Sequence, residues 1–113
     1  MYDKNNVFAR IIRGELPADK IYEDEFALAF HNIHPLAKIH ALVVPRGEYA
    51  DIFDFAENAP ADAQKKFWDA VKKTAKLVSS SGDAHLGANI GQYASVPHFH
   101  VHVMCDDKYI NEA

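Results

Sequence analysis

The stretch His98-Phe99-His100-Val101-His102-Val103-Met104 holds the strongest pattern in this chain. Successive side chains of an extended strand point to opposite faces, so the alternation places the three histidines on one face and the apolar residues on the other. Neighbouring histidines would lie about 6.5–7 Å apart along the backbone. The apolar face, made by Phe99, Val101 and Val103, can pack against a core. We therefore expect a strand over His98–Met104 with a stripe of imidazoles on one side.

The three imidazoles of this stripe should be mostly neutral. Two protonated rings about 7 Å apart repel each other by about 2 kcal/mol at an effective dielectric constant of about 20. Unless an anion offsets this repulsion, neutral rings are favoured. Neutral imidazoles that face one way can act as nucleophiles, general acids, anion binders or metal ligands. A single histidine is usually a surface or core residue, but three in register indicate a functional site.

Two chemistries fit the stripe. A pair of its histidines with His40, on a neighbouring expected strand, would make a workable zinc site. The outer two histidines lie about 13–14 Å apart at the backbone, so all three cannot bind one ion. The alternative is phosphoryl or nucleotidyl transfer by His100, which needs a neutral attacking nitrogen and donors for the phosphate oxygens. Ser95 and the small residues of Gly87–Gln92 could supply such donors.

The rest of the chain predicts an α+β domain. A nearly unbroken apolar run, Ile39–Val44, is typical of a central strand. An amphipathic pattern after Pro60 predicts a long helix to about Ser79, and Asn5 or Asn6 can cap a short helix that stops at Gly14. Further expected elements are strands over 20–23, 26–30 and 84–90 and a helical turn over 51–55. Together these elements favour an antiparallel sheet with helices on one face.

Composition narrows the classes of function. The chain has 113 residues, which predicts a single domain over 1–113, and its net charge of −4 argues against binding to duplex nucleic acid or to a membrane surface. No apolar run approaches the roughly 20 residues that cross a bilayer. The polar N-terminus lacks a signal-peptide core, so we expect a cytoplasmic protein. Cys105 is the only cysteine, which excludes an internal disulfide, and it should point away from the histidine face.

The histidine stretch is similar to the His-φ-His-φ-His-φ-φ signature of the histidine triad (HIT) family, where φ is an apolar residue. The N-terminal half resembles the nucleotide-binding branch of that family over Phe8–Pro17, Ile21–Glu25, Leu28–Phe30 and His40–Pro45. The resemblance covers about residues 7–47 and 87–104. It implies a five-stranded antiparallel sheet with one long and one short helix, and a homodimer with a ten-stranded sheet.

The resemblance also implies an activity. Family members bind purine nucleoside monophosphates and hydrolyse phosphoramidates of the AMP-amine type through a nucleotidyl-histidine intermediate. By position, His100 resembles the nucleophile and His102 the ligand of the α-phosphate, while His98 and His40 would orient and tune His100. Two more polar residues resemble those near the phosphate and leaving group, Ser95 and Asn89.

A base and ribose pocket is implied in the same way. Its residues would be Phe8, Ile11, Leu16, Phe30, His31, Asn32, Ile33 and Leu42. From the residues alone, core packing explains Phe8, Ile11, Leu16 and Leu42 equally well. Asn32 stands where many members have aspartate for the ribose hydroxyls; an amide can still donate and accept, without the charge-assisted part of the bond.

The chain departs from the family pattern in three places. Gly91-Gln92 lies two residues away from where the family has its Gly-Gln pair, as if the phosphate loop were shorter. The acidic pair Asp106-Asp107 follows the triad. Asn6–Ala9 replaces the Cys-x-x-Cys of zinc-binding relatives, so we expect no zinc and no other cofactor. The departures keep open a catalytically weak nucleotide-binding dimer, and the resemblance itself implies a second alternative, a dinucleoside polyphosphate hydrolase.

Overall fold

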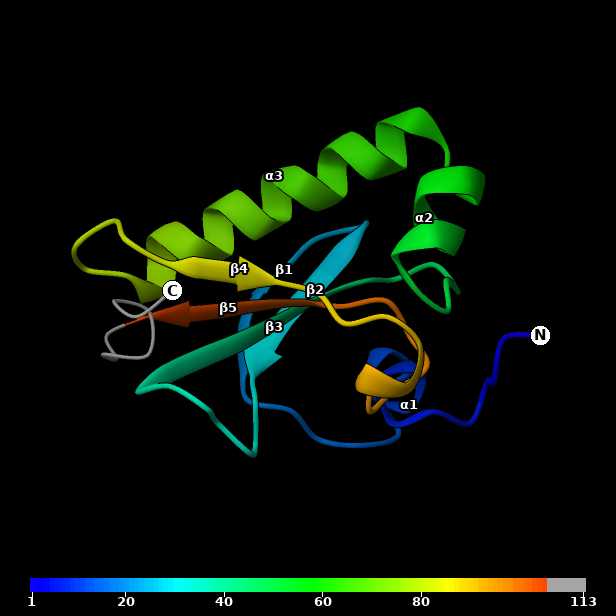
Figure 1. Ribbon diagram of the computed structural model, residues 1–113, viewed down its shortest axis with the longest axis horizontal. Coiled ribbons are helices and arrows are strands. Elements are labelled where there is room, and N and C mark those ends of the chain that lie inside the picture. Colours follow the sequence, from blue (N-terminus) through cyan, green and yellow to red (C-terminus); the bar gives the residue numbers. More distant parts are fainter. Residues whose placement is uncertain (106–113) are drawn as a thin grey trace.

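An antiparallel sheet of five strands, in the order β1-β2-β3-β5-β4, forms the centre of the computed structural model, which describes residues 1–105 (Figure 1). The acidic pair Asp106-Asp107 lies outside the described residues. The sheet confirms the predicted α+β class with five antiparallel strands. The strand bounds are β1 Lys20–Glu23, β2 Ala27–His31, β3 Ile39–Pro45, β4 His85–Gly87 and β5 Val101–Cys105.

Strand β3 is the central strand, as its apolar run predicts. It pairs with β2 on one side and β5 on the other. Its partner in β5 matters for function, because Leu42 lies directly opposite His102. Residues opposite each other in an antiparallel pair share a face of the sheet. Leu42 and the histidine therefore belong to one surface.

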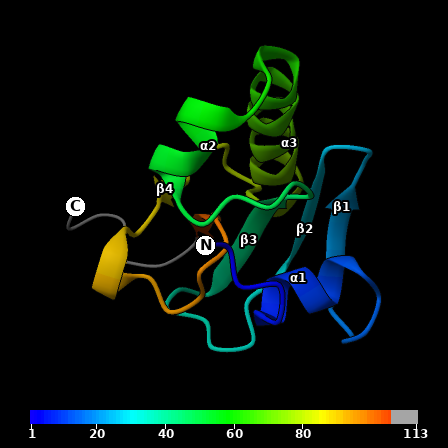
Figure 2. The ribbon, with the colours of Figure 1, turned by 90° about the vertical axis from the view of Figure 1, so that its right-hand side faces the viewer.

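Two helices cover one face of the sheet. These are α2 (Ile52–Asn58) and α3 (Ala61–Val78), and they lie on the same side in both views (Figures 1 and 2). Phe67 of α3 is fully buried, with its ring centroid 5.1 Å from that of Phe55 and 5.3 Å from that of Phe99. Val101 and Val103 join this core, which confirms the predicted apolar face of the histidine strand.

Cys105 also belongs to the α3 side. Its thiol donates to the carbonyl of Val78, at the end of α3, over 3.6 Å. The side chain is fully buried. The prediction that it points away from the histidine face is thus confirmed.

The prediction that all helices lie on one face is wrong for α1 (Val7–Ile12). Phe8 of α1 packs on the opposite face, against the residues Leu28, Phe30, Leu42 and Val44. Alternate residues of β2 and β3, among them Ala27 and Val43, face α3 instead. Because both faces of these two strands are apolar, both need a cover, and the short helix supplies the second.

Several boundaries differ by one or two residues from the expected ones, and three elements differ more clearly. The strand expected over 84–90 is only β4, followed by a 3₁₀ turn over Gly91–Tyr93 (η1). The histidine strand begins at Val101, since the amide of Phe99 donates to the carbonyl of Tyr49, at 2.7 Å, instead of to a neighbouring strand. The turn expected over 51–55 is longer and forms α2, capped by the carboxylate of Asp51. No helix in residues 1–105 is long and apolar enough to cross a membrane.

Candidate active site

The three triad histidines lie on the α1 face of the sheet, at and just before the start of β5. The ring centroid of Phe8 is 6.5 Å from that of His98 and 4.9 Å from that of His100. The His100 and His102 rings are 5.0 Å apart. Although regular pairing starts only at Val101, the alternation still gathers the three rings on one side.

A cavity of about 440 Å³ opens beside the triad, between α1, the start of the β2–β3 loop and β5. It has the size of small-molecule sites in proteins. His100, His102 and Ser95 line it. All the side chains expected for a base and ribose pocket line it too: Phe8, Ile11, Leu16, Phe30, His31, Asn32, Ile33 and Leu42.

The cavity has lining residues that the sequence did not indicate. Among them are Asp19 and His34, which lie in loops where no periodicity marks a side chain as inward. Pro17 and Ala18 could have been found, since they directly follow the expected Leu16. The two loop residues reach the cavity only through the tertiary fold.

His98 lies beside the cavity and is held at both ring nitrogens. Its Nε2 is 2.8 Å from the carbonyl oxygen of Pro45, so Nε2 carries the proton and donates. Its Nδ1 must then accept, and the hydroxyl of Tyr2 donates to it. Burial lowers the pKa of His98 to about 4, although the bond to Pro45 acts in the opposite direction. The ring is therefore neutral near pH 7.

A hydrogen bond to the backbone shows which ring nitrogen of His100 carries the proton. Its Nδ1 is 2.7 Å from the backbone carbonyl oxygen of His98, which can only accept, so Nδ1–H donates. Burial lowers the pKa of His100 below its ordinary value, which favours the neutral ring. In this tautomer Nε2 keeps its lone pair. His100 is thus a neutral imidazole with its Nε2 available as a nucleophile.

His40 sets the proton of His102. The amide of Leu36 donates to Nδ1 of His40 over 3.0 Å, so the proton of His40 is on Nε2. That nitrogen lies 2.8 Å from Nδ1 of His102 and donates to it. Burial is the main cause that lowers the pKa of His102 to about 4, and the nearby His100 and His40 add to it. The neutral His102 therefore carries its proton on Nε2.

The Nε2–H of His102 is the one buried side-chain polar atom without a hydrogen-bond partner in the part of the chain that the structure describes. A buried donor without an acceptor is costly, and a catalytic role or a bound water or ion is among the explanations for such a group in a native protein. His102 shares the cavity wall with His100. The two rings, with centroids 5.0 Å apart, therefore offer a lone pair and an unused donor, a combination that suits attack on a phosphorus atom while one of its oxygens is held.

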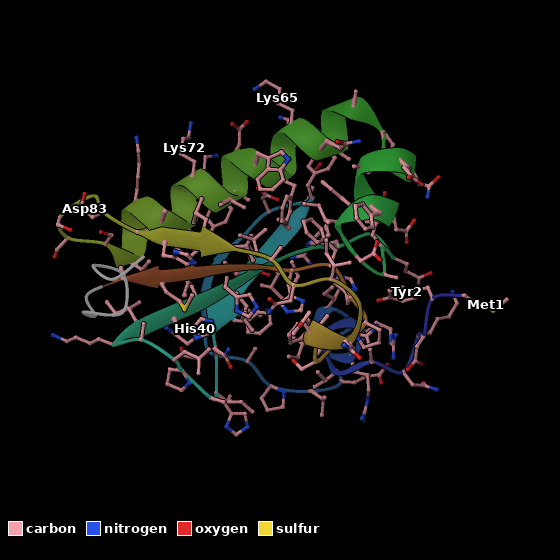
Figure 3. All side chains as sticks on the ribbon, in the orientation of Figure 1. Met1, Tyr2, His40, Lys65, Lys72 and Asp83 are labelled. Atoms are coloured by element: carbon pink, nitrogen blue, oxygen red, sulfur yellow. The ribbon has the colours of Figure 1, made fainter. Side chains whose placement is uncertain are left out.

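The expected partner of His40 was His100, and the structure gives its hydrogen bond to His102 instead. The strand register explains this contact, because His102 lies opposite Leu42, two residues from His40 on the same face of β3. His40 is itself 2 % exposed and does not line the cavity. Figure 3 labels His40, which lies near the start of β3.

Asn89 is separated from the other expected site residues. It lines a second cavity of about 320 Å³, together with Gly87, Ala88 and His102. Because β4 ends at Gly87, beside β5, the chain that follows runs past the far side of His102. His102 borders both cavities and is the link between Asn89 and the triad.

The zinc arrangement considered from the sequence does not form within residues 1–105, where no group of three His, Cys, Asp or Glu side chains is placed to hold a metal ion. Both nitrogens of His98 and both nitrogens of His40 have protein partners. The nitrogens of these two rings are thus used in hydrogen bonds that orient neighbouring groups of the protein.

Comparison with known proteins agrees with this geometry. Residues 13–109 match the model of the HIT domain. An uncharacterized 13.2 kDa HIT-like protein of Azospirillum brasilense is 45% identical over 105 residues, which cover 90% of this chain and 86% of the relative.

Solved structures are similar as well. A HIT family hydrolase from Clostridium thermocellum superposes with a TM-score of 0.81 at 31% identity, covering 92% of both chains. A histidine triad nucleotide-binding protein from Candida albicans gives a TM-score of 0.75 at 28% identity, covering 88% of this chain and 73% of that one. With its triad, its cavity and these matches, the chain belongs to the HIT family.

Proposed function

We propose that this protein binds a purine nucleoside monophosphate unit and hydrolyses phosphoramidates of the AMP-amine type through a nucleotidyl-His100 intermediate. The observation that carries the proposal is the pairing of a lone pair on His100 Nε2 with the unused Nε2–H donor of His102 on one cavity wall. The similarity to a protein named a HIT family hydrolase and to one named a nucleotide-binding protein supports it.

One part of the cavity suits the base and ribose of a nucleotide, and the part beside the triad suits its phosphate. Phe8, Phe30 and Leu42 make an apolar wall on which a flat base can lie. His31 and Asn32 also line the cavity and carry polar groups that can serve as partners for the ribose hydroxyls. The triad end then receives the phosphate. The cavity of about 440 Å³ leaves room for a nucleoside and one phosphate group.

In the first step, the Nε2 lone pair of His100 attacks the phosphorus atom. The bond from phosphorus to the amine nitrogen breaks, its electron pair stays on the nitrogen, and the amine takes a proton from water. His102 Nε2–H donates to a phosphate oxygen as its charge increases in the transition state. Ser95 contributes a hydroxyl at the same wall and can contact the phosphate or the departing amine.

In the second step, a water molecule attacks the phosphorus atom of nucleotidyl-His100. The bond between phosphorus and Nε2 breaks, the electron pair returns to the imidazole, and one proton of the water goes to solvent. AMP leaves, and the histidine is again neutral. Overall, water is added across the phosphorus–nitrogen bond. Asn89, beyond His102, would contact a phosphate oxygen from the neighbouring cavity.

The decisive experiment compares the wild-type protein with His100→Ala on an AMP-amine conjugate. Wild-type protein should release AMP and, after rapid acid quenching, show a mass increase of one nucleotidyl group on the peptide that contains His100. His100→Ala should show no turnover and no adduct while keeping its fold and a weakened affinity for AMP, because only the attacking ring is removed.

His34→Ala is the matched control, since it removes a histidine of the cavity wall that is not part of the triad. It should change KM at most. Turnover by His100→Ala at the wild-type rate would refute the nucleophile. Faster wild-type turnover of a dinucleoside polyphosphate than of the phosphoramidate would refute the substrate class, and micromolar AMP binding without any hydrolysis would favour the catalytically weak binder.

A further inference from the structure

The hydroxyl of Tyr2 contacts the triad, and no step above uses it. It lies on the N-terminal segment and donates to Nδ1 of His98, and the two rings meet edge to face with centroids 5.6 Å apart. Figure 3 labels Tyr2 at the N-terminal end of the molecule, far along the long axis from His40. We infer that Tyr2 is a positioning residue: its hydroxyl holds the ring of His98, whose tautomer is set by the carbonyl of Pro45, and thereby supports the orientation of His100. This inference rests on the proposed function.

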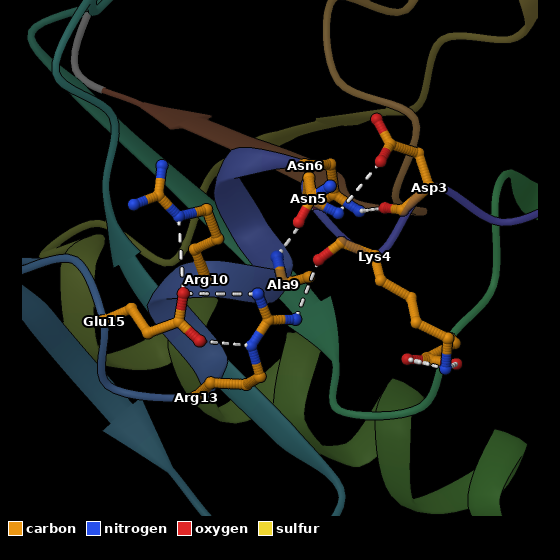
Figure 4. Close-up of polar contacts among 9 residues, drawn as sticks. Asp3, Lys4, Asn5, Asn6, Ala9, Arg10, Arg13 and Glu15 are labelled. Carbon is orange, nitrogen blue, oxygen red and sulfur yellow. Dashed lines mark hydrogen bonds and ion pairs between the residues drawn. The ribbon is translucent and has the colours of Figure 1, made fainter.

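The segment that carries Tyr2 is held in place by its own hydrogen bonds. The side-chain amide of Asn6 donates to the carbonyl of Asp3, at 2.7 Å, and its oxygen caps α1 through the amide of Ala9. Arg13 at the other end of α1 donates to the carbonyl of Lys4, at 2.8 Å. Figure 4 shows these contacts. Tyr2 is thus the next residue along a chain that is anchored to both ends of α1.

A continuous set of contacts leads from Tyr2 to the nucleophile. The hydroxyl donates to His98 Nδ1, and His98 Nε2–H donates to the carbonyl of Pro45 at 2.8 Å. The backbone carbonyl of the same residue, His98, accepts from Nδ1–H of His100 at 2.7 Å. The ring and the carbonyl belong to one residue, so we expect a displacement of His98 as a whole to alter the acceptor that selects the tautomer of His100.

The hydroxyl is needed because His98 is 1 % exposed. With Nε2–H committed to Pro45, Nδ1 must find a donor inside the protein, since a buried acceptor without one is destabilising. Burial, first among the causes, raises the pKa of Tyr2, so its hydroxyl stays protonated and can donate. Phe8 also packs edge to face against His98 and His100, but its ring has no hydrogen-bond donor for Nδ1 of His98.

Tyr2→Phe tests the inference, because it removes the hydroxyl and keeps the ring. Tyr22→Phe is the matched control, because it also removes a part-buried hydrogen bond of a tyrosine hydroxyl, to Asp24 at 2.7 Å. Tyr22 lies on the edge strand β1, which β2 and β3 separate from β5. Tyr2→Phe should lower kcat by about three- to tenfold, as expected for the loss of one hydrogen bond, with KM for the phosphoramidate within about twofold of wild type. Tyr22→Phe should leave both constants unchanged.

Nitrogen-15 magnetic resonance reports which ring nitrogen of a histidine carries the proton and whether the other accepts a hydrogen bond. A loss of packing alone would not change these signals. In wild-type protein, His98 should be protonated on Nε2, with Nδ1 at the shift of a hydrogen-bonded acceptor. In Tyr2→Phe that Nδ1 signal should move toward the free-acceptor value, and the His100 ring signals should move with it.

Equal kcat values in the two variants would overturn the inference, and so would a wild-type spectrum with the His98 proton on Nδ1. The second measurement stands even if Tyr2→Phe does not fold. Failure of the proposed function is distinguishable, since it would appear as wild-type protein without turnover. In that case the inference is tested by the nitrogen-15 signals of the His100 ring in Tyr2→Phe. Signals identical to those of the wild type would overturn it.

Discussion

Two ring nitrogens remain for chemistry once the protein contacts of four histidines are assigned. His98 and His40 use both of theirs. His100 and His102 each use Nδ1, one as a donor and the other as an acceptor. As a result, their Nε2 atoms have opposite characters, a lone pair and an N–H. At the scale of single residues, function follows from which neighbour reaches which nitrogen.

Lowered pKa values in the triad predict a pH dependence of stability. The pKa of His98 falls from 6.5 in the unfolded chain to about 4 in the folded one, mainly through burial. Between these values the unfolded chain binds more protons, so the free energy of unfolding decreases as the pH falls. We expect His98 alone to cost on the order of 3 kcal/mol between pH 6.5 and pH 4, measured by urea unfolding.

His98→Gln is the comparison for this measurement, because its amide can still donate to Pro45 but has no proton to gain in this range. Its free energy of unfolding should fall less steeply over the same pH interval than that of wild type. Parallel curves for the two proteins would show that the pH dependence comes from other groups.

At the scale of elements, the sizes of side chains on β2 and β3 decide which helix covers which face. Ala27, Ala29 and Ala41 face α3, and their small size lets the long helix lie close to the sheet. Larger residues, among them Leu28 and Phe30, face α1, and Phe30 lines the cavity. The α3 side is therefore a packed core, and the α1 side keeps room for a ligand.

Phe67→Ala should show what the α3 core contributes. Phe67 is fully buried and its ring lies against Phe55 and Phe99. Truncation of a buried phenylalanine costs about 3–5 kcal/mol, which urea unfolding would measure. Leu77→Ala is the control on the same helix, where the side chain is 63% exposed and should lose less than about 1 kcal/mol. Similar decreases in the free energy of unfolding for both variants would contradict this role of Phe67 in the core.

The whole molecule has two sheet edges of different character. The β1 edge carries charges, with Lys20 and Arg46 both paired to Glu23. Such charges discourage pairing with another strand. The β4 edge presents Leu86, which is 50% exposed. This contrast favours β4 as the edge through which two copies would join.

We therefore predict a homodimer that pairs through β4. Light scattering after size exclusion should give twice the chain mass of 12.7 kDa. Leu86→Lys should shift the protein toward the monomer, because charge at an edge opposes pairing. Leu77→Lys, on the exposed face of α3, is the control and should stay dimeric. A wild-type species of 12.7 kDa would contradict the prediction.

Local patterns were sufficient to predict most of the strands and the direction of the histidines. Alternation with a period of two depends only on the order of residues along one strand. The sequence of His98–Met104 was therefore enough to predict which residues share each face. The apolar run Ile39–Val44 likewise predicted a buried strand. The cavity wall was anticipated through motifs that resemble those of the family. Helix α1 was predicted correctly from its cap, although its side of the sheet was not.

The protonation states and the role of Tyr2 depend on the tertiary structure alone. Tyr2 and His98 are 96 residues apart, and His40 and His102 are 62 apart. A sequence pattern reports spacing along one element, whereas the tautomer of a ring depends on which distant carbonyl, amide or hydroxyl reaches each nitrogen. The sequence by itself determined that three imidazoles share a face. Only folding, which brings these distant partners together, decided that one of them has a free lone pair beside an unused donor.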